Sequence, residues 1–458
     1  MPVLAHRLRL GPVQATANGA VLLGVGPGLA LYHLVSGNLG LAQVKLGLPF
    51  PAAAAVLAIG VALGVAGGDT STAWPDRRRV PRVLLIAALG GTGLVLGWRG
   101  GTFATPGMIV DAAAIPLGLA HVLRAERLTL SNAHRWDALW LAAGLVLTLA
   151  LLTAYYAWSG SGAVLAGCGV LLTAGVLIAD GGSACESPRP GYRTPVVAIL
   201  ALLLFAVCAG QAAVESAPPP VAPAGPDLTV MTFNIRAGFA RDGIWNLERT
   251  ARTIEEQAPD VVVLQEVSRG WLGRTGTDEV LWLRRRLGMQ VVFGAATDDG
   301  LWGNALLTRL PIEHTERRRF GVNRNLQRSA LMVQLQTRSG AAWVLTTHLA
   351  APQDAGAVRL AQAREMLALV GGRRPALIMG DLNADPDSPE LHLLSGAGFV
   401  DLGRTFGSGA HTSVDYRRID YILATREWEP LEVRIVEVAT SDHRPVVAKV
   451  RLSGSGQR

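Results

Sequence analysis

Short apolar runs that border polar side chains are the feature of this sequence that most restricts its fold. Runs at 228–233, 261–265, 343–347 and 376–380 are rich in Val, Leu, Ile and Thr, and a further run follows at 445–450. Runs of this length and composition predict buried β-strands. The polar residues beside them are Asn234, Glu266, His348, Asp381, Asn383, Asp442 and His443. Each predicted strand therefore places a group capable of metal or proton chemistry at one of its ends.

The strand runs alternate with stretches that have helical spacing. Leu247–Gln257 and Arg359–Val370 are the clearest, with apolar residues three or four positions apart. This alternation over residues 228–453 predicts an α/β domain, and a span of this length is enough to bury a core. We expect residues 454–458 to form a flexible tail.

Residues 1–215 have a different pattern. Half of the 458 residues are hydrophobic, the mean hydropathy is +0.31, and most charged residues lie in the second half. Apolar stretches recur at about 18–36, 47–67, 81–97, 104–123, 137–158, 161–180 and 194–213. Each is close to the roughly 20 residues that cross a bilayer. The pattern predicts an all-α polytopic membrane domain of about seven helices, with six or eight as alternatives.

The charges between these stretches predict an orientation. Arginines gather at the N-terminus and in alternate connecting loops, so the positive-inside rule places the N-terminus in the cytoplasm and the second half outside. The Pro-rich segment 216–227 predicts a short, stiff linker. The net charge of +7 would also suit nucleic acid, but loop arginines of a membrane protein explain it better. The sequence thus predicts a multi-pass protein of the cytoplasmic membrane.

The remaining features of the first half are less specific. Cys168, Cys185 and Cys208 have no spacing typical of a zinc site. Asp111 lies within an expected span, where an acid is costly and often functional, although a hydrated position near the span end is an alternative.

The polar residues of the second half lie in segments that resemble the endonuclease/exonuclease/phosphatase superfamily. The segments are TFNIRAG with Asn234, VVLQEV with Glu266, TTHL with His348, GDLNADPDS with Asp381 and Asn383, RIDYIL with Asp420, and SDHRPV with Asp442 and His443. The resemblance covers about residues 228–452, with all segments in order. It implies an α/β four-layer β-sandwich and a metal-dependent phosphoric ester hydrolase, either a phosphodiesterase, a phosphatase or a nuclease.

The resemblance also implies a metal site. Oxygen ligands suit Mg²⁺ or Mn²⁺, and Glu266 would be the main ligand with Asp442 in support. Asn234 would bind the metal-linked phosphate or orient Glu266. Whether the site holds one metal ion or two is left open.

Catalytic roles follow from the same resemblance. His443, oriented by the Asp420 carboxylate, would activate water as a general base or contact the phosphate. Asp381 and Asn383 would position the attacking water and a phosphoryl oxygen. His348 would polarise a phosphoryl oxygen or assist the leaving group.

Two further residues are candidates for substrate binding, and two arginine clusters are ambiguous. Asn304 resembles a family residue that touches phosphate, with a structural turn as the alternative. Arg328 would contact phosphate or be structural. The clusters at 284–286 and 317–319 would suit nucleic acid or anionic lipid, but charge runs are usually solvated faces.

Three functions remain open at this point. The first is a membrane-tethered phosphoesterase acting on a lipid-linked phosphate at the extracytoplasmic face, because many spans and a short linker would hold the site near the lipid bilayer. The second is an extracytoplasmic nuclease with the same residues, so that nucleic acid is an alternative substrate. The third is a non-enzymatic scaffold or transporter with a phosphate-binding module. No obligate protein partner is expected.

Overall fold

The computed structural model describes residues 25–36, 38–46, 48, 50–70, 88–93, 95, 96, 104–130, 142–152, 161–181, 226–271 and 273–453. The chain divides into two compact units, Met1–Ser216 and Ala217–Arg458. The expected stretch at 194–213, the linker residues 216–225 and the tail 454–458 lie outside the described residues. The domain boundaries stay a prediction for that reason.

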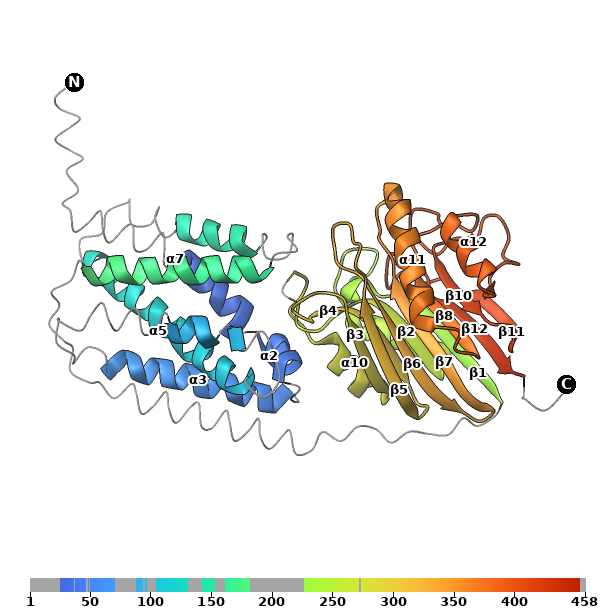
Figure 1. Cartoon of the computed structure of the whole chain (residues 1–458), viewed down its shortest axis with the longest axis horizontal. Helices are drawn as coiled ribbons and strands as arrows, with labels where there is room; N and C mark the ends of the chain where they lie inside the picture. The colour runs from blue at the N-terminus through green and yellow to red at the C-terminus, as the bar shows by residue number, and fades with distance from the viewer. Residues whose placement is uncertain are drawn as a thin grey trace, which may run out of the picture. The chain divides into compact units, whose positions relative to one another are not determined.

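The described part of the first unit is helical (Figure 1). Its named elements are η1 (Tyr32–Ser36), α2 (Leu39–Leu46), α3 (Phe50–Thr70), α5 (Ala104–Leu130) and α7 (Ser161–Gly181). Shorter helical segments lie at 25–31, 88–93 and 142–152.

The expected membrane domain is wrong. Among the residues that the structure describes, no helix combines the length and the apolar character needed to cross a bilayer. This finding contradicts both the all-α polytopic membrane domain of about seven helices and the predicted localisation, with its cytoplasmic N-terminus and extracytoplasmic second half.

Hydropathy led to a wrong prediction because it does not distinguish apolar helices that pack on one another from apolar helices that face lipid. α3 packs against α5 through small residues, and a Cβ atom added at Gly60 would lie 2.3 Å from the Cβ of Ala112. Leu57 and Ile115 are buried within the unit. Asp111 is also buried, and this burial raises the pKa of its carboxyl group to about 8.

The second unit contains two six-stranded sheets. The first has the order β11-β12-β1-β2-β4-β3. Its strands are β1 (Asp227–Asn234), β2 (Val261–Ser268), β3 (Gln290–Ala295), β4 (Trp302–Thr308), β11 (Trp428–Ile435) and β12 (Val446–Leu452). The second sheet has the order β5-β6-β7-β8-β10-β9. Its strands are β5 (Ile312–Arg319), β6 (Ser329–Thr337), β7 (Gly340–His348), β8 (Ala376–Asp381), β9 (Val400–Asp401) and β10 (Asp420–Ala424).

Helices cover the outer faces of both sheets. They are α9 (Leu247–Gln257), α10 (Glu279–Leu287), α11 (Gly356–Val370) and α12 (Pro389–Gly396), with short turns η5 (Arg236–Gly238) and η6 (Gln353–Ala355). α9 begins at the N-cap Asn246, whose side chain accepts a hydrogen bond from the backbone N–H of Arg249. Figure 1 shows α11 and α12 on one side of the sheets and α10 on the other.

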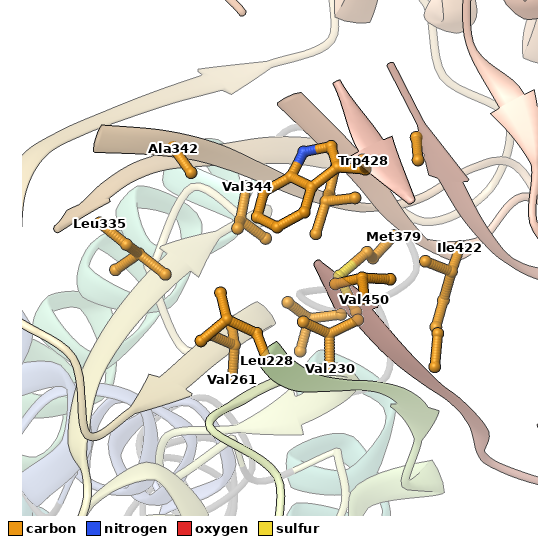
Figure 2. Close-up of a cluster of buried hydrophobic side chains, with 14 of the residues drawn as sticks. Leu228, Val230, Val261, Leu335, Ala342, Val344, Met379, Ile422, Trp428 and Val450 are labelled. Atoms are coloured by element: carbon orange, nitrogen blue, oxygen red, sulfur yellow. The ribbon is translucent and has the colours of Figure 1, made fainter. Parts of the chain in front are cut away.

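Three apolar clusters separate these layers. The central cluster joins the two sheets and includes Val230, Val261, Val344 and Trp428 (Figure 2). A second cluster packs α11 and α12 on the second sheet, and a third packs α9 and α10 on the first. Helices, sheet, sheet and helices therefore form the predicted α/β four-layer β-sandwich, and this part of the fold prediction is confirmed.

Strand direction brings the polar residues to one edge of the sandwich. β1 runs parallel to β2, and β7 runs parallel to β8, so the two strands of each pair end together. The hydrogen bond between Asn234 at the end of β1 and Asp381 at the end of β8 places both pairs at the same edge. β12 is antiparallel to β1, and β10 is antiparallel to β8, so both begin there. The residues at this edge come from separate runs of the sequence, and their buried strands hold them in fixed positions.

Candidate active site

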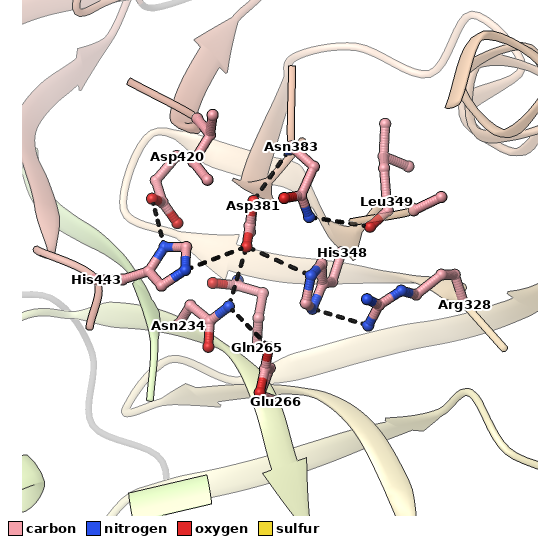
Figure 3. Close-up of polar contacts among 12 residues, drawn as sticks. Asn234, Gln265, Glu266, Arg328, His348, Leu349, Asp381, Asn383, Asp420 and His443 are labelled. Carbon is pink, nitrogen blue, oxygen red and sulfur yellow. Dashed lines mark hydrogen bonds and ion pairs between the residues drawn. The ribbon is translucent and has the colours of Figure 1, made fainter. Parts of the chain in front are cut away.

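The Asp381 carboxylate is the centre of the polar cluster at this edge (Figure 3). Its Oδ2 atom accepts a hydrogen bond from Asn234 Nδ2 at 3.0 Å. The same oxygen lies 3.4 Å from His348 Nε2 and 3.7 Å from His443 Nε2. Burial and the nearby Asp420 charge raise the pKa of Asp381 to about 7, against the opposing effects of His443 and the hydrogen bonds from Asn234 and Asn383. A carboxyl group with this pKa exchanges a proton near neutral pH.

His443 lies between two carboxylates, with Nε2 towards Asp381 and Nδ1 towards Asp420. Its Nδ1 donates to Asp420 Oδ2 over 2.8 Å. Burial lowers the pKa of His443, but the Asp420 and Asp381 charges outweigh that effect and raise it to about 10. His443 is therefore an imidazolium at neutral pH, with one N–H on Asp420 and the other facing Asp381.

His348 has the opposite environment. Its Nδ1 lies 3.1 Å from Nη1 of Arg328, a guanidinium that is itself buried. Burial, followed by the charges of Arg328 and His443, holds the pKa of His348 well below its usual value. His348 is therefore neutral, so the two imidazoles beside Asp381 differ in charge.

Glu266 lies at an irregularity of β2. The register of β2 on β4 shifts between Leu264 and Val267, and Glu266 has a positive φ of 55°. This conformation is strained for a residue with a long side chain, and such strain concentrates at functional sites. The carboxylate lies 3.5 Å from Asn234 Nδ2 and 3.6 Å from an Arg274 nitrogen.

Asp442 lies on the loop before β12 and faces a second arginine. Its Oδ2 is 3.2 Å from Nε of Arg236. Arg236 begins the turn after β1, in which Arg236, Ala237 and Gly238 all have positive φ. Ser441 ties the two segments together, because its hydroxyl donates to the backbone oxygen of Asn234 at 2.7 Å.

The amide side chains of the cluster have defined orientations. Asn234 Oδ1 accepts the backbone N–H of Arg236 at 3.1 Å, so its nitrogen is the atom that faces Glu266 and Asp381. Asn383, with a φ of 49°, donates its backbone N–H to Asp381 Oδ1 and its side-chain N–H to Leu349 O.

Asn304 lies at the border of this cluster. It is buried in β4, and its side chain donates to the backbone oxygen of Ser329 at 3.0 Å. Ser329 is the first residue of β6 and immediately follows Arg328, so Asn304 supports the chain beside the buried guanidinium.

The structure thus brings together nine of the ten predicted site residues through direct contacts or through a shared neighbour, with Asn304 behind them. The nine are Asn234, Glu266, Arg328, His348, Asp381, Asn383, Asp420, Asp442 and His443. Three neighbours were missed by sequence reasoning: Arg236, Arg274 and Ser441. Arg236 and Ser441 stand inside the TFNIRAG and SDHRPV segments, whereas no signal in the sequence points to Arg274.

The arginine clusters lie away from these contacts. Arg286 forms ion pairs with Glu248 and Glu255 and so joins α10 to α9. Arg319 pairs with Asp298, while Arg317 is exposed on the edge strand β5. At least part of each cluster therefore has a structural role.

The second unit is similar to a known protein family. Residues 231–443 match the sequence model of the Endonuclease/Exonuclease/phosphatase family. Members of this family are phosphoesterases or nucleases and typically use divalent metals.

Solved structures of similar proteins each cover about half of the chain. The endonuclease/exonuclease/phosphatase from Beutenbergia cavernae DSM 12333 is 27% identical, with 50% of this chain and 72% of that chain covered and a TM-score of 0.44. A family protein from Bacteroides thetaiotaomicron is 16% identical, with 49% and 98% covered and a TM-score of 0.42. The human Nocturnin catalytic domain, with a bound sulfate anion, is 20% identical, with 51% and 99% covered and a TM-score of 0.41. The match to the Endonuclease/Exonuclease/phosphatase family thus concerns residues 231–443 of this chain, within the second unit.

Proposed function

We propose that the second unit hydrolyses a phosphate ester with the help of a divalent cation, Mg²⁺ or Mn²⁺. The observation that carries this proposal is the convergence of Asn234, His348 and His443 on one oxygen of the buried Asp381 carboxylate. A base that titrates near neutral pH, surrounded by hydrogen-bond donors, suits the attack of water on a phosphoryl group.

The carboxylates of Glu266 and Asp442 fit such a cation. Both are hard oxygen donors, and their side chains are 21% and 27% exposed, so solvent reaches them. When bound, the cation would offset negative charge on the phosphoryl oxygens. Because Asn234 turns its nitrogen towards Glu266, we propose that it orients this carboxylate rather than binding the cation.

A second group of potential ligands fits less well. One ligand atom from each of Asp381, Asp420 and His443 lies within 4.8 Å of the others. However, His443 holds a proton on each ring nitrogen at neutral pH, and a protonated nitrogen has no lone pair for a metal. The positive charge of protonated His443 already offsets the negative charge of Asp420, so this group attracts a cation less strongly.

The protonation states assign the remaining roles. Asp381 accepts a proton from the attacking water, since its pKa is about 7. His443 is charged, so it binds a phosphoryl oxygen through Nε2–H rather than acting as a general base. Asn383 holds Asp381 in place through its backbone N–H.

The substrate is defined here only as a phosphate ester. A lipid-linked phosphate was expected because of the membrane spans, and the expected spans are wrong. A cavity of about 740 Å³ begins at Ala384 and Asp385, directly after Asn383. Its walls include the ion pairs Arg359–Glu390 and Arg417–Asp385. We propose that this cavity receives the part of the ester that is not hydrolysed.

A substrate panel tests the proposal. The purified full chain would be incubated with p-nitrophenyl phosphate, bis(p-nitrophenyl) phosphate, plasmid DNA and a dispersed phospholipid, with Mg²⁺, Mn²⁺ or a chelator. We expect metal-dependent hydrolysis that is lost in Asp381→Asn and retained in Asp387→Asn, a matched change at an exposed position. Cleavage of DNA alone would narrow the activity to a nuclease. Hydrolysis at equal rates in wild type and Asp381→Asn would refute the assignment of the site.

A further inference from the structure

Arg328 is a buried guanidinium with an unusual set of neighbours. It precedes β6, and only 7% of its surface is exposed. Buried arginines normally pair with carboxylates. Within the described part of the chain, however, Arg328 forms no ion pair, and its Nε atom has no hydrogen-bond partner. The guanidinium instead contacts the ring of His348 (Figure 3).

This contact fixes which nitrogen of His348 carries the proton. A guanidinium has N–H donors and no acceptor. Nη1 of Arg328 therefore donates to His348 Nδ1 across the 3.1 Å contact, and Nδ1 accepts with its lone pair. The single proton of the neutral ring must then lie on Nε2. The positive charge of Arg328 also disfavours a second proton on the ring, in agreement with the lowered pKa of His348.

The Nε2 proton points into the cluster. His348 Nε2 lies 3.4 Å from Asp381 Oδ2, the oxygen that also accepts from Asn234. A carboxylate on Nδ1 would instead favour an imidazolium, as Asp420 does for His443. The two histidines thus receive different protonation states from partners of opposite charge.

The backbone of Arg328 is held firmly enough to keep this contact. Its N–H donates to Asn323 Oδ1 at 2.8 Å, and its carbonyl oxygen accepts from the N–H of Phe320. Gln362 of α11 in turn donates to Asn323 and to the carbonyl of Val322. The loop before β6 is therefore fixed on α11, and the guanidinium has little freedom to leave His348.

We propose that Arg328 is a positioning residue that holds His348 in its neutral Nε2–H form and so directs that proton at a phosphoryl oxygen bound beside Asp381. The second part of this statement rests on the proposed function, whereas the protonation state of His348 does not. Arg328 acts through His348, so its loss should affect turnover more than substrate binding.

The test separates these two parts. Nitrogen-15 NMR of the full chain labelled at histidine reports the tautomer of each ring, and His348→Asn identifies the His348 signals. We expect the Nε2–H tautomer in the wild type across neutral pH. Arg328→Met removes the donor and should give a mixture of tautomers or an imidazolium. Arg328→Lys keeps a charged donor and should restore the Nε2–H form in part.

Turnover supplies the second readout. In Arg328→Met we expect kcat to fall by about 10- to 100-fold, the effect of one hydrogen bond from a charged group, with KM unchanged. Arg328→Lys should recover part of this loss. Arg317→Met, a matched change at an exposed position, should match the wild type in both readouts. Thermal melting of each variant establishes that it is folded.

Two results would overturn the proposal. One is a wild-type spectrum in which His348 carries its proton on Nδ1 or is an imidazolium. The other is a raised KM with unchanged kcat in Arg328→Met, which would assign Arg328 to direct substrate binding. If the wild type hydrolyses no ester, the proposed function fails, while the NMR result still decides the role of Arg328 towards His348.

Discussion

Replacement of Asp420 by Asn isolates the contribution of one buried charge to the site. Asp420 is 2% exposed, and its Oδ2 accepts from His443 Nδ1 at 2.8 Å. The substitution keeps the shape of the side chain but removes the charge that favours the imidazolium of His443. It also removes a like charge that raises the pKa of Asp381.

The magnitude follows from these contacts. A hydrogen bond between charged groups contributes about 1.5–3 kcal/mol, which corresponds to about 10- to 150-fold in rate. We expect kcat to fall by this factor. The low-pH limb of the rate profile should move to lower pH, because Asp381 loses its proton more readily once the Asp420 charge is absent.

Folding should change less than activity. The hydrogen bond from His443 to an uncharged acceptor is weaker and lowers stability, while the loss of repulsion between Asp420 and Asp381 raises it. The assay is hydrolysis of bis(p-nitrophenyl) phosphate in excess Mg²⁺ between about pH 5 and pH 9, with thermal melting to check folding. Asp387→Asn is the matched control.

A folded Asp420→Asn protein whose kcat and pH profile match those of the wild type would show that the Asp420 charge does not contribute to the site. A profile displaced to higher pH would also contradict the expected direction, because it would mean that Asp420 acts on Asp381 mainly through the charge of His443 rather than by direct repulsion.

Three further predictions concern stability and metal binding. Burial raises the pKa of Glu279 well above 4.5. Between pH 4.5 and this raised pKa, the folded protein keeps a proton that the unfolded chain releases. The free energy of unfolding therefore falls as the pH rises through this range. Glu279→Gln should weaken this fall in denaturant unfolding, and the exposed Glu256→Gln should not. Gly380→Ala should lower the free energy of unfolding by more than about 2 kcal/mol, because the added Cβ atom would lie 2.1 Å from a backbone oxygen of β7. Gly396→Ala is the control and should have a smaller effect, because its Cβ atom would meet no atom within 4 Å. Mg²⁺ should raise the melting temperature of the wild type but not of Glu266→Gln; equal shifts in both would place the metal elsewhere.

Much of the site was predictable from the sequence because strand ends are marked locally. The run at 376–380 predicts a buried strand, and Asp381 ends it as β8. Glu266 and His348 likewise fall within the last residues of β2 and β7. The strands fix the positions of the side chains at their ends. Once the strands pair, these side chains lie at one edge of the sandwich.

The membrane expectation failed for a related reason. Stretches of Ala, Gly, Val and Leu are equally apolar whether they face lipid or other helices. The close approach of α3 and α5 at Gly60 is a property of the folded unit and cannot be read from the composition of either stretch.

The ends of the strands and the polar groups beside them follow from local patterns, because periodicity and composition act over a few neighbouring residues. The charge of each polar group depends instead on partners that only the folded chain brings close. Asp420 reaches His443, and Arg328 reaches His348, across different strands and loops. Burial and contact with these partners make one imidazole charged and the other neutral, and both effects depend on distances that no local pattern encodes.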